Sequence, residues 1–372
     1  RITNNRLYRI VQEDMTNNNN EESWNCDCSA PTYKEIKETI KDLKANKACS
    51  GFASIELIKK SFPLQRIIAI MIKRIWNQQD AIPKDWLKAD ICLFYKKGDN
   101  RDPKNFRPIS LMTIGEKIIS NIIYKRIKEE INKRISEHQA GFRQGFSTRQ
   151  PVWKVSRKIK RSKKFKKALI LTFLDFKKAF DSLNHDIMIK ILHKRGMPPI
   201  FIKLIQLIYS EATMTIRYDS EGHIPRVINQ KRGVRQGSAL SPCLFVLCLD
   251  TVLRKFKEMN ELESNGDTNK LVRYEAYADD IALIATRILE MNRAIANIQA
   301  GCLYIGLELN PEKCETLAMN TKNKKEKTGI PMKEKVLIEG VEKWIYEKEG
   351  YRQVVSEIEM QDLKRRWKIK NK

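Results

Sequence analysis

Apolar residues recur along most of the chain at spacings typical of helices and strands. Isoleucine, leucine and methionine spaced three or four residues apart predict amphipathic helices, because such positions share one helical face. Short, densely apolar runs predict strands. The expected helices begin near Pro31 and then cover residues 64–78, 116–135, 199–211, 242–253 and 288–304. The expected strands cover residues 89–95, 168–174 and 213–218, with two more on either side of residues 279–280.

The run from Ala168 to Leu174 is nearly continuous in apolar residues, which predicts a strand buried on both faces. It ends at Asp175, where the pattern becomes helical and continues so toward Lys194. The junction between a central strand and a helix is a standard place for catalytic groups in open sheets. Asp175 is therefore a candidate catalytic residue.

Asp279 and Asp280 lie between two short apolar runs, which predicts a β-hairpin with both aspartates at its tip. Taken alone, the pair indicates an ordinary turn, since aspartate is common in turns. If the hairpin and the strand before Asp175 are neighbours in one antiparallel sheet, three carboxylates meet and need cations to neutralise them. Two Mg²⁺ ions would then stabilise the attacking and leaving oxygens of phosphoryl transfer.

The charge balance narrows the choice of partners. The formal net charge is +26 and the isoelectric point about 9.7, with basic residues spread along the chain, which favours nucleic acid over a membrane. No apolar run is long enough to span a bilayer. None of the eight cysteines forms a Cys-x-x-Cys pair and the four histidines are scattered. This pattern favours reduced thiols of an intracellular protein over a zinc site.

Two basic segments leave alternatives open. The run Arg157–Lys167 is either a solvated linker or a patch that binds the backbone of nucleic acid. Lys97 and Arg107 belong to a predicted hairpin after residues 89–95, which suits an anionic ligand such as a triphosphate. A solvated basic hairpin would explain the same two residues.

Six short motifs occur in the order of a known family. Residues 173–181 (Phe-Leu-Asp-Phe-Lys-Lys-Ala-Phe-Asp), 233–242 and 277–280 (Tyr-Ala-Asp-Asp) resemble motifs A, B and C of reverse transcriptases. Residues 106–111 and 139–143 are similar to the fingers motifs of non-LTR (LINE-type) retrotransposon enzymes, and Gly306-Leu307 with Asn310 and Lys313 is similar to their motif D. Any one of these could occur by chance, but six in order could not. The resemblance covers roughly residues 31–320.

The resemblance implies an α+β, right-hand polymerase fold. Its fingers and palm would be present, with an antiparallel palm sheet packed on helices, and its thumb missing or truncated. The expected boundaries are a poorly ordered lead-in at 1–30, fingers at 31–170 and a palm at 171–320. Residues 321–372 would be a basic C-terminal segment, a remnant of the primer grip or thumb.

The resemblance also implies roles for individual residues. Asp175 and Asp279 would be metal ligands, with Asp280 a weaker or indirect one and the backbone carbonyl of Phe176 completing the coordination. Phe180, five residues after Asp175, falls at the steric gate, where an aromatic ring would collide with a ribose 2′-hydroxyl and so select dNTPs.

Further positions would contact the substrates. Gln236 and Gly237 would line the dNTP pocket, and Tyr277 would touch the primer end. Lys97 and Arg107 would hold the phosphates of the nucleotide. Lys313 is a candidate general acid for pyrophosphate, with a plain surface lysine as the alternative.

The implied activity is that of an RNA-directed DNA polymerase which adds dNTPs to a primer 3′-hydroxyl with two Mg²⁺ ions, or Mn²⁺ in their place. Its partners would be an RNA template and a DNA primer or target DNA. An endonuclease would lie outside this chain, and the site of action would be intracellular, in the nucleus.

Two departures from the family keep other functions open. Ala53 stands where the early fingers motif has an acidic residue, and Gln353-Val354-Val355 stands where the primer grip has an aromatic-Leu-Gly signature. One alternative is a catalytically inactive, retroelement-derived nucleic-acid-binding protein. The other is a protein similar to intron maturases.

Overall fold

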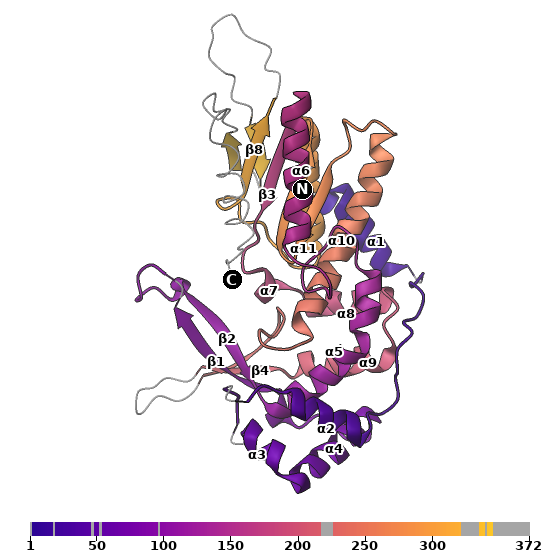
Figure 1. Cartoon of the computed structure of the whole chain (residues 1–372), viewed down its shortest axis with the longest axis vertical. Helices are drawn as coiled ribbons and strands as arrows, with labels where there is room; N and C mark the ends of the chain where they lie inside the picture. The colour runs from indigo at the N-terminus through magenta and orange to yellow at the C-terminus, as the bar shows by residue number, and fades with distance from the viewer. Residues whose placement is uncertain are drawn as a thin grey trace, which may run out of the picture. The chain divides into compact units, whose positions relative to one another are not determined.

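The computed structural model describes residues 2–17, 19–45, 48–51, 54–95, 97–216, 226–320, 335–338 and 341–344. The chain forms two compact units, each assembled from segments that are distant in the sequence (Figure 1). Unit 1 comprises Arg1–Asn17, Arg134–Ser182 and Phe245–Lys372. Unit 2 comprises Asn18–Lys133 and Leu183–Leu244.

Unit 1 is built on a four-stranded antiparallel sheet in the order β6-β7-β3-β8. Its elements are the 3-10 turn Ile2–Asn4, α1 (Arg6–Thr16), α6 (Arg149–Phe165), β3 (Leu169–Leu174), α7 (Ala179–Ser182), most of α10 (Ser241–Ser264), β6 (Arg273–Tyr277), β7 (Asp280–Ala285), α11 (Ile288–Tyr304) and β8 (Glu315–Met319). β9 (Lys335–Ile338) and β10 (Val341–Trp344) pair in a separate two-stranded sheet.

Both faces of the central sheet are covered, as the continuous apolar run of β3 predicts. On one face, Val152, Val155 and Ile159 of α6 pack in one buried cluster with Leu169 and Leu171 of β3. The alternate residues of β3, such as Ile170 and Leu174, are buried toward the other face. α11 contacts both β3 and β7. The expectation of a central strand that is buried on both sides is confirmed.

In the lead-in expected at residues 1–30, the described residues 2–17 and 19–30 are held in place by packing, which corrects the expectation of poor order. Residues 6–16 form α1, which Asn5 caps at its N-terminus and which buries Leu7 and Val11. α1 packs along α11, where Gly301 leaves room for the Leu7 side chain and Tyr8 meets Tyr304 edge-on at 5.3 Å. Polar residues dominate this segment, so its short apolar stripe is easily overlooked.

Residues 19–30 are also fixed, within unit 2. The Trp24 side chain is buried, and its indole N–H donates to the backbone carbonyl of Arg195. Arg195 is itself buried and lies 3.4 Å from the Glu21 carboxylate. A single tryptophan thus anchors a segment whose composition is otherwise typical of disorder.

Unit 2 combines helices with a mixed sheet in the order β2-β1-β4-β5. Its elements are α2 (Tyr33–Asp42), α3 (Ile55–Lys60), α4 (Phe62–Trp76), the 3-10 turn Lys84–Leu87, β1 (Lys88–Tyr95), the 3-10 turn Pro103–Asn105, β2 (Phe106–Met112), α5 (Ile114–Arg134), α8 (His185–Lys194), α9 (Pro199–Ser210), β4 (Thr213–Ile216) and β5 (Arg226–Asn229). β1 and β2 form the predicted antiparallel hairpin, and β4 adds to β1 in parallel.

Three local expectations are corrected. The helix expected to end near residue 253 continues to Ser264. Phe256 and Met259 are still buried along this extension, while the polar residues Lys255, Glu258 and Glu261 between them obscure the pattern in the sequence. The helix expected after Asp175 is broken into α7 and α8. The two units also divide the chain differently from boundaries at 170 and 320, since α6 packs on β3 and residues 183–244 belong to unit 2.

The described helices and strands confirm a mixed α+β fold with an antiparallel sheet packed on helices. Within the described ranges, no helix combines the length and the apolar character that crossing a membrane requires. Ala53, Gln353 and most of the expected C-terminal segment lie outside the described residues.

Candidate active site

The end of β3 holds Asp175 in a defined place. The backbone N–H of Asp175 faces the Cys314 sulfur at 3.4 Å, and the Asp175 carbonyl accepts a 2.7 Å hydrogen bond from the N–H of Asn310. Cys314 is completely buried. Further along β3, Thr172 pairs with Thr316 of β8, and their hydroxyls meet at 2.9 Å. Asn310 of the predicted motif D and Cys314, just before β8, therefore hold the backbone of Asp175.

The predicted hairpin exists, but its two-residue turn lies one residue earlier than the expected Asp279–Asp280 tip. Tyr277 and Asp280 are paired residues of β6 and β7, so Ala278 and Asp279 alone make the turn. Ala278 has a positive φ of 55°, a conformation that a two-residue hairpin loop often demands at its first position. Asp279 therefore lies at the tip, whereas Asp280 is the first residue of β7.

The strand register brings the two aspartate sites together. Leu174 of β3 pairs with Ile281 of β7, so the next positions in the ladder are Asp175 and Asp280. Residues directly opposite in an antiparallel pair have Cβ atoms about 5 Å apart on the same face. From the sequence, the strand before Asp175 and the hairpin could only be assumed to be neighbours in one sheet, and the register shows that they are.

Gln139 fixes the hairpin turn at Ala278–Asp279 and was not foreseen as a site residue. Its fully buried amide accepts hydrogen bonds from the N–H groups of Ala278 and Gly141, both at 2.8 Å, and its Nε2 donates to the Ala278 carbonyl at 3.1 Å. On either side of it, the Ala140 N–H donates to Ala276 at 2.9 Å and the Ala276 N–H donates to His138 at 2.7 Å. One side chain thus satisfies both backbone groups of the strained turn residue.

Gly141 makes this contact sterically possible. A Cβ atom at Gly141 would lie only 2.2 Å from the backbone nitrogen of Ala278. The motif at 139–143 was expected to belong to the fingers, but the structure places it in unit 1 against the hairpin turn. Its only signal in the sequence was the resemblance itself, because Gln139 and Ala278 are 139 residues apart.

The donor set suits a hard divalent cation. Carboxylate and carbonyl oxygens are the ligands that Mg²⁺ and Mn²⁺ prefer. Phe176 forms an isolated bridge with Leu309, and the two flanking hydrogen bonds use the Asp175 carbonyl and the Lys177 N–H, so neither occupies the Phe176 carbonyl. Among the described residues, however, no three acidic, histidine or cysteine side chains are gathered closely enough to hold a metal ion. The strand register thus brings the aspartates onto neighbouring strands, but the side chains do not form a complete set of metal ligands.

Phe180 is packed between two other aromatic rings. It stacks on Phe245 of α10, with centroids 4.3 Å apart and an interplanar angle of 22°, and it meets the edge of Phe142 at 6.0 Å. Phe245 is fully buried, whereas 47% of Phe142 is exposed. The ring of Phe180 is therefore held by an immobile neighbour, which is what a steric selector requires.

Tyr277 and Lys313 have different surroundings. Tyr277 is partly buried and packs against the apolar cluster beneath α6. Lys313 is exposed in the turn just before Cys314. Its backbone N–H donates to Asn310 at 3.0 Å. The roles expected for both side chains remain predictions.

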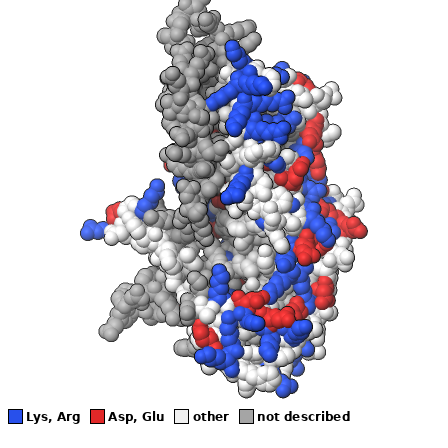
Figure 2. All heavy atoms as spheres, viewed as in Figure 1, with Lys and Arg blue, Asp and Glu red and all other residues white. Residues whose placement is uncertain are grey.

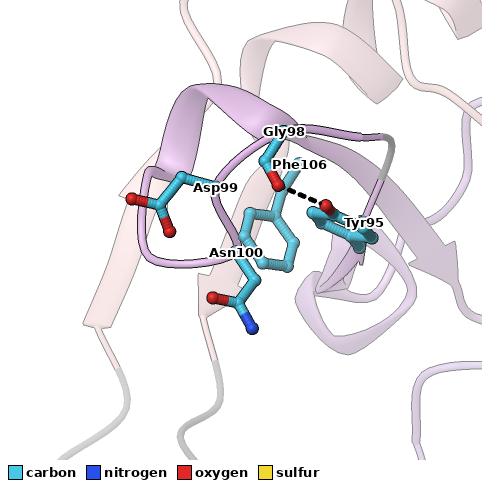
Figure 3. A pocket seen from close by; sticks show the side chains of 5 residues that line it. All are labelled: Tyr95, Gly98, Asp99, Asn100 and Phe106. Atoms are coloured by element: carbon cyan, nitrogen blue, oxygen red, sulfur yellow. Dashed lines mark hydrogen bonds between the residues drawn. The ribbon is translucent and has the colours of Figure 1, made fainter.

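In unit 2, Lys97 lies in the turn of the β1–β2 hairpin. This turn bounds a hollow of about 630 Å³, lined by Tyr95, Gly98, Asp99, Asn100 and Phe106 (Figure 3). The Tyr95 hydroxyl donates to the Gly98 carbonyl, and the rings of Tyr95 and Phe106 meet at 5.6 Å. Among the side chains that the structure describes, those lining this hollow include none of the predicted site residues. Lys97 is exposed, and Arg107 is a strand residue whose side chain lies outside the described set.

Buried contacts of Arg235 anchor the loop from Gly233 to Pro242. Arg235 is buried, with its Nε 3.1 Å from a Glu116 carboxylate oxygen and its Nη1 donating to the Leu87 carbonyl at 2.9 Å. The Ser241 hydroxyl donates to the Arg235 carbonyl at 2.6 Å. Burial raises the pKa of the Glu116 carboxyl to about 7, while the Arg235 guanidinium opposes that rise. The ion pair thus fixes the residue next to Gln236.

Gly237 could not be replaced without strain. It has a φ of +119°, and a Cβ atom there would lie 2.9 Å from the Ser110 carbonyl of β2. Gln236 is partly exposed and Gly237 exposed. The structure therefore brings the backbone of Gly237 against β2, the strand that carries residues 106–111, within unit 2.

Comparison with known proteins places the chain in a family. Residues 95–342 match the family model described as reverse transcriptase (RNA-dependent DNA polymerase). The chain belongs to the reverse transcriptase family. This confirms the family, the fold class and the type of enzyme that the six motifs imply.

The curated relatives of this reverse transcriptase are retrotransposon proteins. The chain is 29% identical over 263 residues to "Retrovirus-related Pol polyprotein from type-1 retrotransposable element R2" of Nasonia vitripennis, covering 70% of this chain and 25% of the relative. It is 29% identical over 326 residues to "Probable RNA-directed DNA polymerase from transposon BS" of Drosophila melanogaster, covering 83% and 34%. It is also 30% identical to the R2DM Pol polyprotein of the same fly, covering 61% and 21%.

The chain thus spans about a fifth to a third of the length of these relatives. Reverse transcriptases generally depend on a metal ion, and their template and primer are nucleic acids. The oxygen donors at Asp175, Phe176, Asp279 and Asp280 are consistent with that dependence.

Proposed function

We propose that this chain is the RNA-directed DNA polymerase of a non-LTR retrotransposon, adding dNTPs to a primer 3′-hydroxyl on an RNA template. The observation that carries the proposal is the ladder of β3 and β7, whose last pair, Leu174 and Ile281, directly adjoins Asp175 on one strand and Asp280 on the other. The Gln139 amide holds the adjoining Ala278–Asp279 turn. A strained turn that buried hydrogen bonds hold in place is expected where the position of a side chain decides the rate of the reaction.

The metal ligands would be Asp175 and Asp279, with Asp280 in a supporting role and the Phe176 carbonyl as a fourth oxygen donor. Two Mg²⁺ ions, or Mn²⁺ ions, would supply charge neutralisation at the attacking and leaving oxygens when bound. The chain's own contribution is to fix these oxygens: Cys314 and Asn310 hold the Asp175 backbone, and Gln139 holds the turn.

Nucleotide selection is assigned to Phe180. Its ring is fixed by stacking on the buried Phe245, so a ribose 2′-hydroxyl would meet a side chain that cannot move aside. Phe180→Ala should raise rNTP incorporation relative to dNTP in single-nucleotide extension, while Phe146→Ala, which alters another aromatic residue of unit 1, should leave the ratio unchanged. An unchanged ratio in Phe180→Ala would remove Phe180 from this role.

The remaining roles follow from the family resemblance. We assign Gln236 and Gly237 to the dNTP, Lys97 and Arg107 to its phosphates, and Tyr277 to the primer end. The Lys313 ammonium would donate a proton to the departing pyrophosphate. The endonuclease would belong to a region outside this chain, and DNA synthesis on target DNA would take place in the nucleus. Imaging of a tagged full-length protein tests that location.

Extension of oligo(dT) on poly(rA) with Mg²⁺ tests the activity. The native chain should extend the primer, Asp279→Asn should lose at least about a thousandfold in rate, and Asp85→Asn should match the native chain. Asp85 is a suitable control because its exposed side chain pairs with Lys88 on the surface of unit 2. If the native chain binds the duplex at low salt but never extends it, the inactive nucleic-acid-binding alternative replaces this proposal.

A further inference from the structure

The helix α6 presents two faces of opposite character. Val152, Val155 and Ile159 form its buried stripe, which packs on β3 and β7. At 3.6 residues per turn, the positions opposite that stripe are Trp153, Arg157, Lys160, Arg161 and Lys164, and all five are exposed. We call these five residues the outer face of α6.

The outer face lacks carboxylates to balance its charge. No aspartate or glutamate occurs in the sequence from His138 to Leu174. The carboxylate that pairs with α6 is Glu275 of β6, which lies 2.9 Å from Lys154 on the side toward the sheet. Among the described residues, no ion pair joins Arg157, Lys160, Arg161 or Lys164 to a carboxylate. Figure 2 shows lysine and arginine gathered over the region where Figure 1 draws α6.

This arrangement is unfavourable for an isolated helix. Arg157–Arg161 and Lys160–Lys164 are like-charge pairs at i,i+4 spacing, each of which destabilises a helix. The pKa of Lys158 is lowered by burial and by the nearby charges of Arg273 and Arg161. The dipole of the helix favours basic residues in the last turn, which accounts for Lys163 and Lys164 but not for Arg157 or Lys160 in the middle. A polyanion would relieve this repulsion.

Exposed aromatic rings indicate which polyanion fits. Sixty per cent of Trp153 is exposed, and the Arg157 guanidinium lies 5.1 Å from the centre of its ring. At the other end of the helix, Phe165 is 55% exposed with the Lys164 ammonium 5.5 Å from its ring. Basic residues interleaved with exposed rings are the means by which proteins bind single strands, through the backbone and through stacked bases.

Two other partners fit less well. A membrane-surface helix would direct its apolar stripe outward, but the apolar stripe of α6 is buried on the sheet. Duplex nucleic acid offers phosphates without free bases, so it would leave the exposed indole of Trp153 unused.

The position of α6 connects this face to the chemistry of unit 1. The helix begins at Arg149, shortly after the segment in which Gln139 and Gly141 hold the Ala278 turn. Its 17 residues then extend for about 25 Å. A strand bound along it would therefore lead away from the turn that carries Asp279.

We propose that the outer face of α6 is a binding track for single-stranded RNA, separate from the catalytic carboxylates. Phosphates would contact Arg157, Lys160, Arg161 and Lys164, and a base would stack on Trp153. This resolves the open choice for the run Arg157–Lys167 in favour of a nucleic-acid patch.

The test measures binding of a labelled 20-nucleotide oligo(rA) by fluorescence anisotropy across a series of KCl concentrations. The variant changes Arg157, Lys160, Arg161 and Lys164 to Gln. Its matched control changes Lys34, Lys37, Lys41 and Lys44 to Gln, four exposed lysines of unit 2 that carry the same total charge. Both should keep the native circular dichroism spectrum, because Gln preserves helix propensity.

The α6 variant should lose at least about tenfold in affinity at 100 mM KCl, and its plot of log affinity against log salt should flatten by about 3, at roughly 0.7 per phosphate contact for single strands. The control should change by less than half as much on both measures. Trp153→Ala should weaken binding about fivefold or more without changing the salt slope. Equal losses in variant and control would overturn the proposal, as would duplex RNA binding that suffers more than single-strand binding.

The measurement does not depend on catalysis. The same comparison in an Asp279→Asn background should give the same differences, so a failure of the polymerase proposal would leave this result standing. If the α6 variant binds oligo(rA) like the native chain, the track does not exist, whatever the polymerase assay shows.

Discussion

The turn at Ala278–Asp279 in unit 1 and the loop at Gly233–Pro242 in unit 2 are both anchored in the interior, but by different chemistry. The turn is held by a neutral amide, Gln139, through two hydrogen bonds to the backbone of Ala278, and the same amide also accepts from the Gly141 N–H. The loop is held by the buried ion pair of Arg235 and Glu116. Hydrogen bonds between neutral groups are insensitive to pH, whereas a buried carboxylate costs desolvation energy and titrates.

This difference indicates which kind of anchoring group, neutral or charged, the turn and the loop can each accommodate. If Asp175 and Asp279 hold a metal ion as proposed, the turn beside them is best held by neutral groups, because a nearby fixed charge would shift the carboxylate pKa values. The loop, which supplies Gln236 and Gly237, can be held by a charged pair. The three predictions that follow test this contrast, beginning with the largest expected effect.

Gln139→Leu should damage the turn most. It leaves the Ala278 N–H, the Ala278 carbonyl and the Gly141 N–H without their partner, which should lower the free energy of unfolding by on the order of 4 kcal/mol. Displacement of Asp279 should lower kcat by about a hundredfold or more. Chemical denaturation and steady-state extension measure the two effects.

Gln139→Glu provides a graded comparison, because its carboxylate still accepts from both N–H groups but loses the donor to the Ala278 carbonyl and adds a buried charge beside the turn. Its kcat should lie between those of the native chain and Gln139→Leu, while KM for dTTP should change less than about threefold in both variants. A rise in KM with kcat unaltered would show that Gln139 does not position the carboxylates.

Glu116→Gln should change how stability depends on pH. The pKa of Glu116 rises from 4.5 to about 7 on folding, so the native state holds the proton more tightly than the unfolded state. Stability from this group is therefore present below pH 4.5 and is lost as pH rises through 7, by up to about 3 kcal/mol. Denaturation of both proteins from pH 4.5 to 8 should give a difference curve with that slope, and two parallel curves would contradict it.

Gly237→Ala should have the smallest effect, confined to substrate binding. The left-handed backbone and the close Ser110 carbonyl both resist a Cβ atom, so the loop should shift and KM for dTTP should rise about tenfold. Gly266→Ala is a matched control, because it has a φ of +77° with open space around it. Should both variants raise KM equally, the contact with Ser110 would not be the cause.

Elements with a strong local pattern could be predicted from the sequence. The helix over residues 288–304 has the predicted bounds, and the strand before Asp175 begins one residue later than expected. Both are encoded by consecutive residues whose periodicity is plain. The hairpin at Asp279 was also evident, since two apolar runs flank a short polar turn.

Pairings between distant segments could not be predicted. The amide of Gln139 meets a turn 139 residues away, and Arg235 meets Glu116 of α5, which lies 119 positions earlier in the numbering. Neither residue type at those positions carries a local signal of burial. α1 was missed for another reason: Leu7 and Val11 form a short stripe in a polar segment, and only packing on α11 makes it a stable helix.

The most direct test of the central claim is single-nucleotide incorporation of dTTP opposite poly(rA) under single-turnover conditions, comparing the native chain with Asp175→Asn. Duplex affinity is measured in the same samples. The account predicts that Asp175→Asn loses at least about a thousandfold in rate while its affinity for the duplex stays within about threefold. Incorporation by Asp175→Asn at the native rate would contradict the assignment of Asp175 and the hairpin aspartates as the catalytic centre.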